Sequence, residues 1–252
     1  MMQRNELVDY LAQLLDVARF NDYAPNGLQV EGSATVARII GGVTASQALV
    51  EAAREKGADA LLVHHGYFWK GEDPCVVGMK QRRLKALLDA GINLLAYHLP
   101  LDAHPELGNN AQLAALLGFS ATGGFGGQGG PDIGQQGELA VPRSGEALAV
   151  HIARQLGREP LHIAGPQAEI RRIAWCTGAA QSYIEEAAAL GVDAFVTGEV
   201  SEQTVHVARE MGIHFFAAGH HATERYGVQA LGQHLASRFE VAFEFVDIPN
   251  PV

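Results

Sequence analysis

Histidines and carboxylates gather at three places where a short apolar run, which favours a β-strand, gives way to a loop. They are His64 and His65, then His98 and Asp102, then His220 and Glu224. In α/β folds the ends of strands are where ligand-handling residues lie. Imidazole and carboxylate without thiolate are the ligand combination of a hydrolytic metal site. The sequence therefore predicts a metal-binding centre.

The first two groups also have simpler interpretations. Adjacent residues of an extended strand point to opposite faces, so His64 and His65 each bind a different ion only if the strand ends there. A packed or a surface histidine is the alternative. We expect Asp102 to lie in a loop because Pro100 blocks a regular helix, and Asp is also common in turns that have no function.

The third group combines one histidine and one carboxylate. The pattern predicts a helix over 222–237, so His220 and Glu224, four residues apart, would face one site near its N-terminus. The alternative is the ordinary preference for Glu in a first helical turn. His221 is interpreted as a spectator.

Other polar and aromatic residues are predicted to support these groups. We expect His98 to orient a ligand rather than bind an ion, and Glu199 either to support the site or to cap the next helix. Tyr67 and Trp69 would wall a pocket for a flat substrate or pack at a subunit contact. Lys70 and Arg225 would meet a substrate phosphate or remain surface charges. The remaining histidines are interpreted as structural: residues 104, 151, 162, 206, 214 and 234.

Hydrophobic periodicity predicts the elements that carry these residues. Helices are expected over 7–15, 46–56, 80–90, 110–117 and 144–156, and strands over 36–43, 60–63, 92–97, 138–141 and 161–164. The glycine-rich stretch 123–137 lacks the strand, helix and lysine of a phosphate cradle, so it is predicted to be a flexible surface loop.

The second half of the chain repeats the first. Residues 39–60 match residues 173–194 without a gap at an offset of 134 positions, including the Gly-x-Asp-Ala of each half. An internal duplication of a strand–helix–strand unit explains the match, and chance similarity of two amphipathic units is the alternative. At the same offset His65 corresponds to Glu199. Allowing a one-residue slip against the later match of Gly91-Ile92 with Gly212-Ile213, His98-x-x-x-Asp102 corresponds to His220-x-x-x-Glu224. We therefore expect a site between two related halves.

Composition excludes several classes of protein. The 252 residues carry a formal charge of −10, which argues against long nucleic-acid contacts, and the basic residues between 80 and 85 are interpreted as a solvated helix face. Two cysteines, Cys75 and Cys176, imply no disulfide framework, which fits a reducing cytosol. No signal peptide or membrane span is indicated, so a cytoplasmic protein is expected.

We expect a first α/β half over 1–120, a connection over 121–168, and a second half over 169–252.

Four motifs together resemble one known family. They are Val63-His-His-Gly-Tyr-Phe-Trp69, His98-Leu-Pro-Leu-Asp102, Thr197-Gly-Glu199 and Gly219-His-His-Ala-Thr-Glu-Arg225. In order and spacing they are similar to the signatures of the Nif-three-like dinuclear-metal proteins, also called GTP cyclohydrolase I type 2-like proteins. The second of these motifs, His98 to Asp102, more often reads His-Thr-Asn-Leu-Asp in the family. Leu99-Pro100 departs from that form, while the residues at both ends of the motif match it.

The resemblance implies a fold, a ligand set and an assembly. The fold would be α/β, with two interlocked units of three-layer sandwich character. The metal ligands would be His64, His65, Asp102, His220 and Glu224, holding two divalent ions such as iron, zinc or manganese. The assembly would be a toroidal homohexamer, a trimer of dimers. Longer relatives carry an inserted domain where this chain has the glycine-rich stretch, so functions of that domain are not implied.

Two functions of different classes follow. The first is a metal-dependent hydrolase in which metal-activated water attacks a small-molecule substrate, a nucleotide or modified nucleobase. The second is a non-catalytic metal-binding regulatory or interaction protein. Five protein ligands shared between two ions leave coordination positions open, which favours catalysis, since a structural site closes its shell. A purely structural protein with a coincidental ligand set is the third interpretation.

Overall fold

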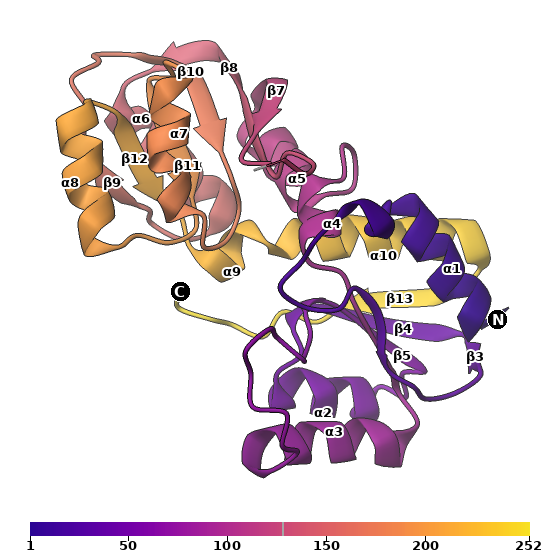
Figure 1. The fold of residues 1–252 in the computed structure, drawn as a ribbon. Coiled ribbons are helices and arrows are strands. Elements are labelled where there is room, and N and C mark those ends of the chain that lie inside the picture. The colour runs from indigo at the N-terminus through magenta and orange to yellow at the C-terminus, as the bar shows by residue number, and fades with distance from the viewer. Residues whose placement is uncertain (128) are drawn as a thin grey trace. The chain divides into compact units, whose positions relative to one another are not determined.

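The chain builds a five-stranded sheet and a six-stranded sheet, and each belongs to its own compact unit (Figure 1). The computed structural model describes residues 1–127 and 129–252. Unit 1 comprises Met1–Gly108 and Gly227–Ile248, and unit 2 comprises Asn109–Tyr226 and Pro249–Val252. The chain therefore leaves unit 1, completes most of unit 2, and returns to unit 1.

Unit 1 is built around a mostly parallel sheet. Its strands, in spatial order, are β13 (Ala242–Phe245), β4 (Arg38–Thr44), β5 (Ala60–His65), β6 (Asn93–Ala96) and β2 (Gly27–Val30). Only β2 runs antiparallel to its neighbour. Two short strands, β1 (Met2–Gln3) and β3 (Thr35–Val36), pair with each other and form a separate two-stranded sheet.

Helices cover both faces of this sheet, so unit 1 has three layers (Figure 1). The covering helices are α2 (Gln47–Glu55) and α3 (Gly78–Ala90) on one face, and α1 (Arg4–Leu14) and α10 (Arg225–Phe239) on the other. Leu49 of α2 and Leu7 of α1 are fully buried and belong to the two separate apolar clusters of unit 1. The Ser46 hydroxyl accepts a hydrogen bond from the Leu49 amide and caps α2, which typically stabilises a helix by about 1 kcal/mol.

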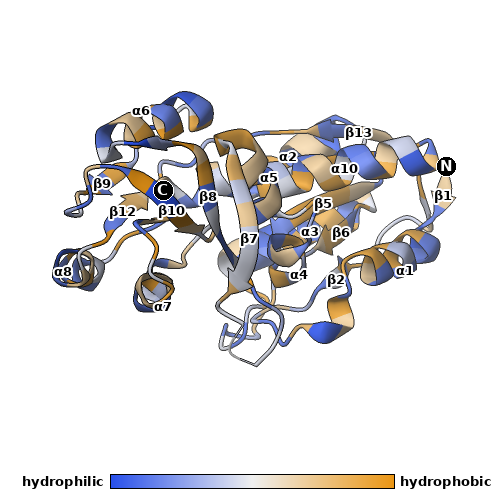
Figure 2. Ribbon diagram, turned by 90° about the horizontal axis from the view of Figure 1, so that it is seen from above, coloured by the Kyte–Doolittle hydropathy of each residue, from blue (hydrophilic) through white to orange (hydrophobic). Residues whose placement is uncertain are grey.

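Unit 2 is also a three-layer α/β unit, with a mixed sheet. Its strands, in spatial order, are β7 (Phe119–Phe125), β8 (Gly134–Arg143), β10 (Ile170–Trp175), β11 (Ala194–Thr197), β12 (His214–Ala217) and β9 (Leu161–Ile163). The helices are α5 (Asn109–Leu117), α6 (Gly145–Leu156), α7 (Ile184–Ala189), α8 (Glu202–Met211) and α9 (His220–Thr223). Figure 2 shows α6 on one face of this sheet and α7 and α8 on the other.

The predicted duplication is present in the hydrogen bonds of the two sheets. Asp59 accepts backbone N–H bonds from residues 37 and 38 at 2.8 and 2.9 Å, and Asp193 accepts them from residues 171 and 172 at 2.8 Å each. The same offset of 134 positions relates β2 to β9, and each is an antiparallel strand at an edge of its sheet. The repeat therefore extends beyond the segment that the sequence match covers.

The glycine-rich stretch 123–137 is only in part the surface loop that its composition suggested. Its two ends, residues 123–125 and 134–137, lie in the antiparallel strands β7 and β8, and Gln128 between them lies outside the described residues. A Cβ on Gly137 would meet the Ser120 carbonyl oxygen at 2.0 Å, so glycine permits the two backbones to approach. The expected connection over 121–168 accordingly contributes β7, β8, α6 and β9 to unit 2.

The helices and strands near the candidate ligands also differ from expectation. Strand β5 continues through His64 and His65 rather than ending before them. Pro100 lies in the first turn of the short helix α4 (Leu99–Ala103), where proline is tolerated because the first N–H groups need no partner within the helix. Asp102 is therefore helical and not in a loop. Among the described residues, no helix is long and apolar enough to cross a membrane.

Candidate metal centre

In unit 1, His64 is oriented by the backbone of the neighbouring strand. Its Nδ1 lies 2.9 Å from the carbonyl oxygen of Tyr97. A carbonyl oxygen only accepts, so Nδ1 donates, and a neutral ring in this tautomer carries its lone pair on Nε2. Nε2 lies 3.5 Å from Oδ1 of Asp102, and both side chains are buried. An imidazole nitrogen and a carboxylate oxygen thus meet at one point in the interior.

His65 is held from the other side of β5 by Thr44. The hydroxyl of Thr44 lies 3.0 Å from Nδ1 of His65, and the two residues are paired in the register of β4 and β5. The sequence analysis missed Thr44. Thr44 lies one residue beyond the predicted strand 36–43, so it comes opposite His65 only when both predicted strands are extended and aligned as a parallel pair.

His98 lies against these two histidines and has its own support. Its Nδ1 bonds to Oδ1 of Asp22 at 2.7 Å, and Asp22 also accepts from the Leu99 amide at 3.0 Å. Burial raises the pKa of the Asp22 carboxyl, but the bond and charge of His98 outweigh burial and lower it overall. Ligand atoms of His64, His65 and His98 lie within 4.8 Å of one another, so His98 is itself a candidate ligand and not only a support.

One of the two aromatic residues proposed as a pocket wall is instead part of the core. Tyr67 is buried and its hydroxyl donates to the Ala45 carbonyl oxygen at 2.8 Å; burial raises its pKa to about 12. Trp69 contacts the rings of His65 and His98, with centroids 5.9 and 5.0 Å away. Tyr23, which the sequence analysis did not single out, lies edge-on to His98 and is 62 % exposed.

In unit 2, His220 lies between two carboxylates. Its Nε2 is 3.1 Å from Oε2 of Glu224, and its Nδ1 is 2.6 Å from Oε1 of Glu199. Burial lowers the pKa of His220, but the bond and charge of Glu224, followed by those of Glu199, outweigh burial and raise the pKa to about 9. Glu199 therefore supports His220 and does not cap α8, whose N-cap is Ser201.

The backbone of unit 2 makes room for this group at Gly178. A Cβ there would lie 2.1 Å from Oε1 of Glu224 and 3.2 Å from Nε2 of His220. The Gly178 amide donates to the hydroxyl of Thr223 at 3.1 Å, and its φ of +69° suits glycine. Gly178 is the duplication partner of Thr44, so both halves use this position to shape the site.

The helix that carries the second group is broken. The expected continuous helix over 222–237 is two helices, α9 and α10, and Glu224 is the residue between them. Its φ of −109° and ψ of 7° depart from helical values, and its side chain is buried. The Arg225 guanidinium donates to the Leu156 carbonyl oxygen at 2.8 Å, which gives this cation a structural contact.

The remaining histidines, which the sequence analysis interpreted as structural, bond to residues of their own units. Each has at least one hydrogen-bond partner near it: His104 with residues 106 and 107, His151 with Leu117, His162 with His214, His206 with Glu202, and His234 with Tyr10. The expectation that the groups of the two halves combine into one site remains a prediction.

The donor chemistry of both groups fits a divalent metal. Nitrogen and carboxylate oxygen are ligands for zinc, manganese and iron, and outer hydrogen bonds to the ring nitrogens are what metal-binding histidines normally have. Fold and side chains together describe a mixed α/β protein with two related units and candidate metal ligands in each.

Comparison with known sequences places the chain in a family. The sequence profile of Duf34/NIF3 (NGG1p interacting factor 3) matches residues 2–251, so the chain belongs to this family. A Pseudomonas aeruginosa protein named GTP cyclohydrolase 1 type 2 homolog is 62% identical over 245 residues, covering 97% of both chains. An Escherichia coli protein of the same name is 56% identical over 252 residues, covering 99% of this chain and all of its own.

Solved structures have the same fold. Protein ybgI, described as of unknown function, is 56% identical and has a TM-score of 0.96 with full coverage of both chains. The protein TTHA1606 from Thermus thermophilus is 36% identical, with a TM-score of 0.91 over the full length of both chains. Reduced HcgD from Methanocaldococcus jannaschii is 21% identical at a TM-score of 0.85, which supports the fold alone.

Proposed function

We propose that this protein holds two divalent metal ions with His64, His65, Asp102, His220 and Glu224 and uses them to hydrolyse a small molecule. One observation carries the proposal. Every histidine of the two candidate groups has its Nδ1 at a hydrogen-bonding oxygen, so that Nε2 is the ring nitrogen that would bind a metal ion. That the two groups together form one metal site is part of the proposal. It rests on the duplication and on the family.

The residues would divide the work. Bound ions would lower the pKa of water toward neutrality and stabilise the charge that develops on a phosphoryl or carbonyl oxygen. Asp102 and Glu224 would bridge or orient the ions, because each is a buried carboxylate beside an imidazole. Asp22 and Glu199 would keep His98 and His220 in one orientation by accepting from their Nδ1 atoms.

The substrate class we favour is a nucleotide or a modified nucleobase. Trp69 and the exposed Tyr23 supply aromatic surface next to His98, on which a flat ring would stack. The likeness to GTP cyclohydrolase is by name only, through the relatives named GTP cyclohydrolase 1 type 2 homolog. From the family resemblance we also propose a cytoplasmic homohexamer, a toroidal trimer of dimers, without membrane or extended nucleic-acid partners.

The test is a substrate screen on metal-loaded protein, run beside an Asp102→Ala variant. We expect at least one nucleotide or nucleobase derivative to be hydrolysed by the natural protein and not by the variant. If no substrate separates the two while both retain their fold, the hydrolase proposal fails. Full metal loading without any turnover would favour the non-catalytic regulatory protein.

Metal content gives an independent test of the ligands. His65→Ala and Glu224→Gln should each lose bound metal, measured by atomic emission after dialysis. The matched control is the exposed pair Glu202 and His206, four residues apart and 2.7 Å from each other in α8. Glu202→Gln and His206→Ala should keep the metal. Equal metal content in all four variants would contradict the ligand set.

A further inference from the structure

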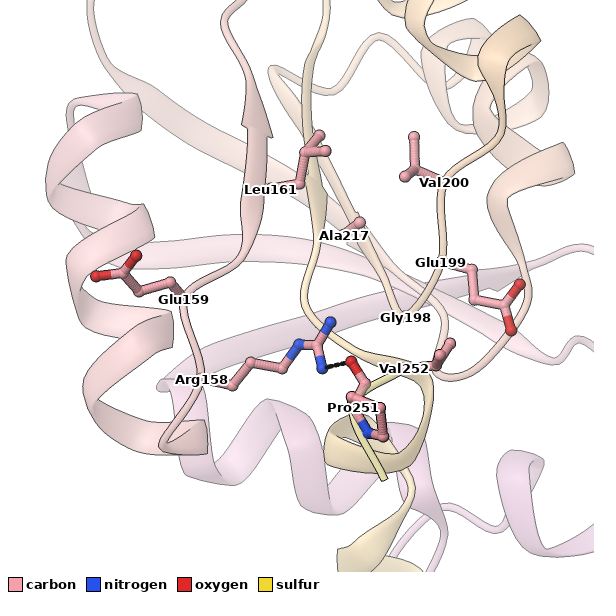
Figure 3. Close-up of a pocket in the computed structure, with 9 residues that line it drawn as sticks. All are labelled: Arg158, Glu159, Leu161, Gly198, Glu199, Val200, Ala217, Pro251 and Val252. Carbon is pink, nitrogen blue, oxygen red and sulfur yellow. Dashed lines mark hydrogen bonds between the residues drawn. The ribbon is translucent and has the colours of Figure 1, made fainter. Parts of the chain in front are cut away.

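Unit 2 contains a pocket at the edge strand β9 that the proposed metal site does not use (Figure 3). Its volume is about 320 Å³, within the range of pockets for small molecules. Leu161, Val200 and Ala217 give it apolar walls, and Arg158 brings a positive charge. The lining therefore combines apolar walls with one cation, Arg158, and two carboxylate residues, Glu159 and Glu199.

Arg158 has hydrogen-bonding capacity to spare. Its Nη1 donates to the carbonyl oxygen of Pro251, drawn as the dashed line in Figure 3. Its Nε is buried and has no hydrogen-bond partner within residues 1–127 and 129–252. In the same described part of the chain, Arg158 forms no ion pair, and Figure 3 shows the Glu159 carboxylate pointing away from it. A guanidinium with unused donors at the wall of a pocket is suited to an anion.

The pocket adjoins the proposed ligand His220 by two routes. Glu199 lines the pocket and also bonds to Nδ1 of His220. The stem of Arg158 lies against Gly219, the residue before His220, because a Cβ on Gly219 would be 2.8 Å from both Cδ and Nε of Arg158. A molecule held by Arg158 would thus be anchored within one residue of the candidate metal group.

Unit 1 uses the corresponding place differently. The segment before its edge strand β2 carries Asp22 and Asn26, whose side chains bond to His98. In unit 2 the segment before β9 carries Arg158 and opens into the pocket. One half therefore fills this place with groups that hold a histidine, and the other leaves a cation facing a cavity.

We infer that this pocket binds an oxyanion group, a phosphate or a carboxylate, of a small molecule with Arg158 as its anchor. The bound oxygen would take the place that the Pro251 carbonyl now has at Nη1. Leu161, Val200 and Ala217 would contact the uncharged part of the molecule. That this molecule is the substrate rests on the proposed function, whereas the binding of the anion does not.

The experiment is calorimetric titration of the full chain with inorganic phosphate and, separately, with acetate, before and after treatment with EDTA. We expect saturable binding of at least one anion that survives EDTA, and the stronger of the two identifies the group. Arg158→Gln should weaken binding about tenfold or more, as expected for loss of a charge-assisted hydrogen bond. Arg154→Gln, which removes an exposed charge from the last turn of α6, four residues before Arg158, should change it less than about twofold.

Arg158→Lys covers the case in which Arg158→Gln does not fold. It keeps the charge and loses the planar fork, so it should bind more weakly than Arg154→Gln. The inference is overturned if neither anion binds, if EDTA abolishes binding, or if the Arg158 variants bind as well as Arg154→Gln. A failed hydrolysis screen would leave these titrations unchanged. If the Arg158 variants bind the anions as tightly as the natural protein does, the proposal that the pocket binds an anion is overturned, even if Asp102→Ala abolishes turnover.

Discussion

The two units share a frame and differ where their strands end. Asp59 and Asp193 accept the same pair of backbone bonds in each half. Thr44 in unit 1, however, contributes a hydroxyl to His65, whereas its partner Gly178 in unit 2 contributes only space for Glu224 and His220. Duplication thus retained the scaffold, and the chemistry diverged at single positions on the ends of equivalent strands.

The divergence gives the halves different electrostatics. Unit 1 gathers three histidines, held by a carbonyl, a hydroxyl and one carboxylate. Unit 2 places one histidine between two carboxylates, which raises the pKa of His220 to about 9. Without metal, His220 is therefore protonated at neutral pH, and a metal ion binding there must displace that proton.

The largest effect is expected from adding a side chain at Gly178 of unit 2, where unit 1 has Thr44. Gly178→Ala puts a methyl group against the Glu224 carboxylate and should weaken metal binding about 100-fold or more, the upper end for lost ligand support. Gly57→Ala is the matched control, because Gly57 also has a positive φ, +62°, but open space around its Cβ. Both variants should lose about 1 kcal/mol of stability, and only Gly178→Ala should lose metal in a competition titration.

A smaller effect is expected from the groups behind the histidines. Glu199→Gln removes the charge that His220 bonds to, and should lower metal affinity about 10- to 100-fold. Thr44→Val removes a neutral partner of His65 and should fall near the tenfold end of that range. Equal affinities for the two variants would contradict the electrostatic difference between the halves. The metal affinity of each purified variant is measured by competition with a chelator.

The shared frame predicts equal losses at Asp59 and Asp193. Replacing either by Ala leaves two backbone N–H groups without their acceptor, and should lower the free energy of unfolding by about 1–3 kcal/mol. Urea unfolding followed by hydrogen exchange would assign each loss to its own unit. A loss in one variant only would show that the two frames are not energetically equivalent.

The smallest effect concerns acid sensitivity. His162 in β9 bonds to His214 at 3.0 Å, and burial followed by the charge of His214 lowers its pKa; Glu146 opposes this. Because the folded pKa lies below the unfolded value of about 6.5, this residue's contribution is present above that pH and is lost as pH falls below it.

Unit 1 has Leu28 at the corresponding position, so its edge strand β2 has no histidine there. His162→Leu should therefore flatten the decline in unfolding free energy below about pH 6.5, measured by urea titration at several pH values. The exposed His206→Gln is the control and should leave the decline in place. An unaltered decline in His162→Leu would assign the acid sensitivity to other groups.

Much of the fold was accessible from the sequence because the periodicity and the repeat are strong. The helices α1, α2, α3 and α6 and the parallel strands β4, β5 and β6 begin and end close to their predicted residues. The candidate ligands were found because they follow apolar runs. Residues that depend on pairing were not found: Thr44 becomes visible only when β4 is aligned with β5, and Arg158 only when β9 is placed at an edge.

The errors have local physical causes. Pro100 was taken to exclude a helix, although a proline in a first turn costs no hydrogen bond. The glycines around Gly137 were taken to indicate flexibility, but they let two strands approach more closely than a side chain would allow. Composition alone does not separate a glycine that loosens the backbone from one that permits close packing.

The return of the chain to unit 1 has a consequence for folding during synthesis. Strand β13 pairs with β4, and α10 supplies Leu231 and Leu235 to a cluster whose other members are mostly in the first hundred residues. Unit 1 is synthesised first but lacks one sheet edge and one covering helix until residue 245 leaves the ribosome. The usual order, in which the N-terminal unit folds first, is therefore reversed here. A nascent chain halted after Tyr226 should protect the amides of unit 2 while leaving those of β4 open to exchange.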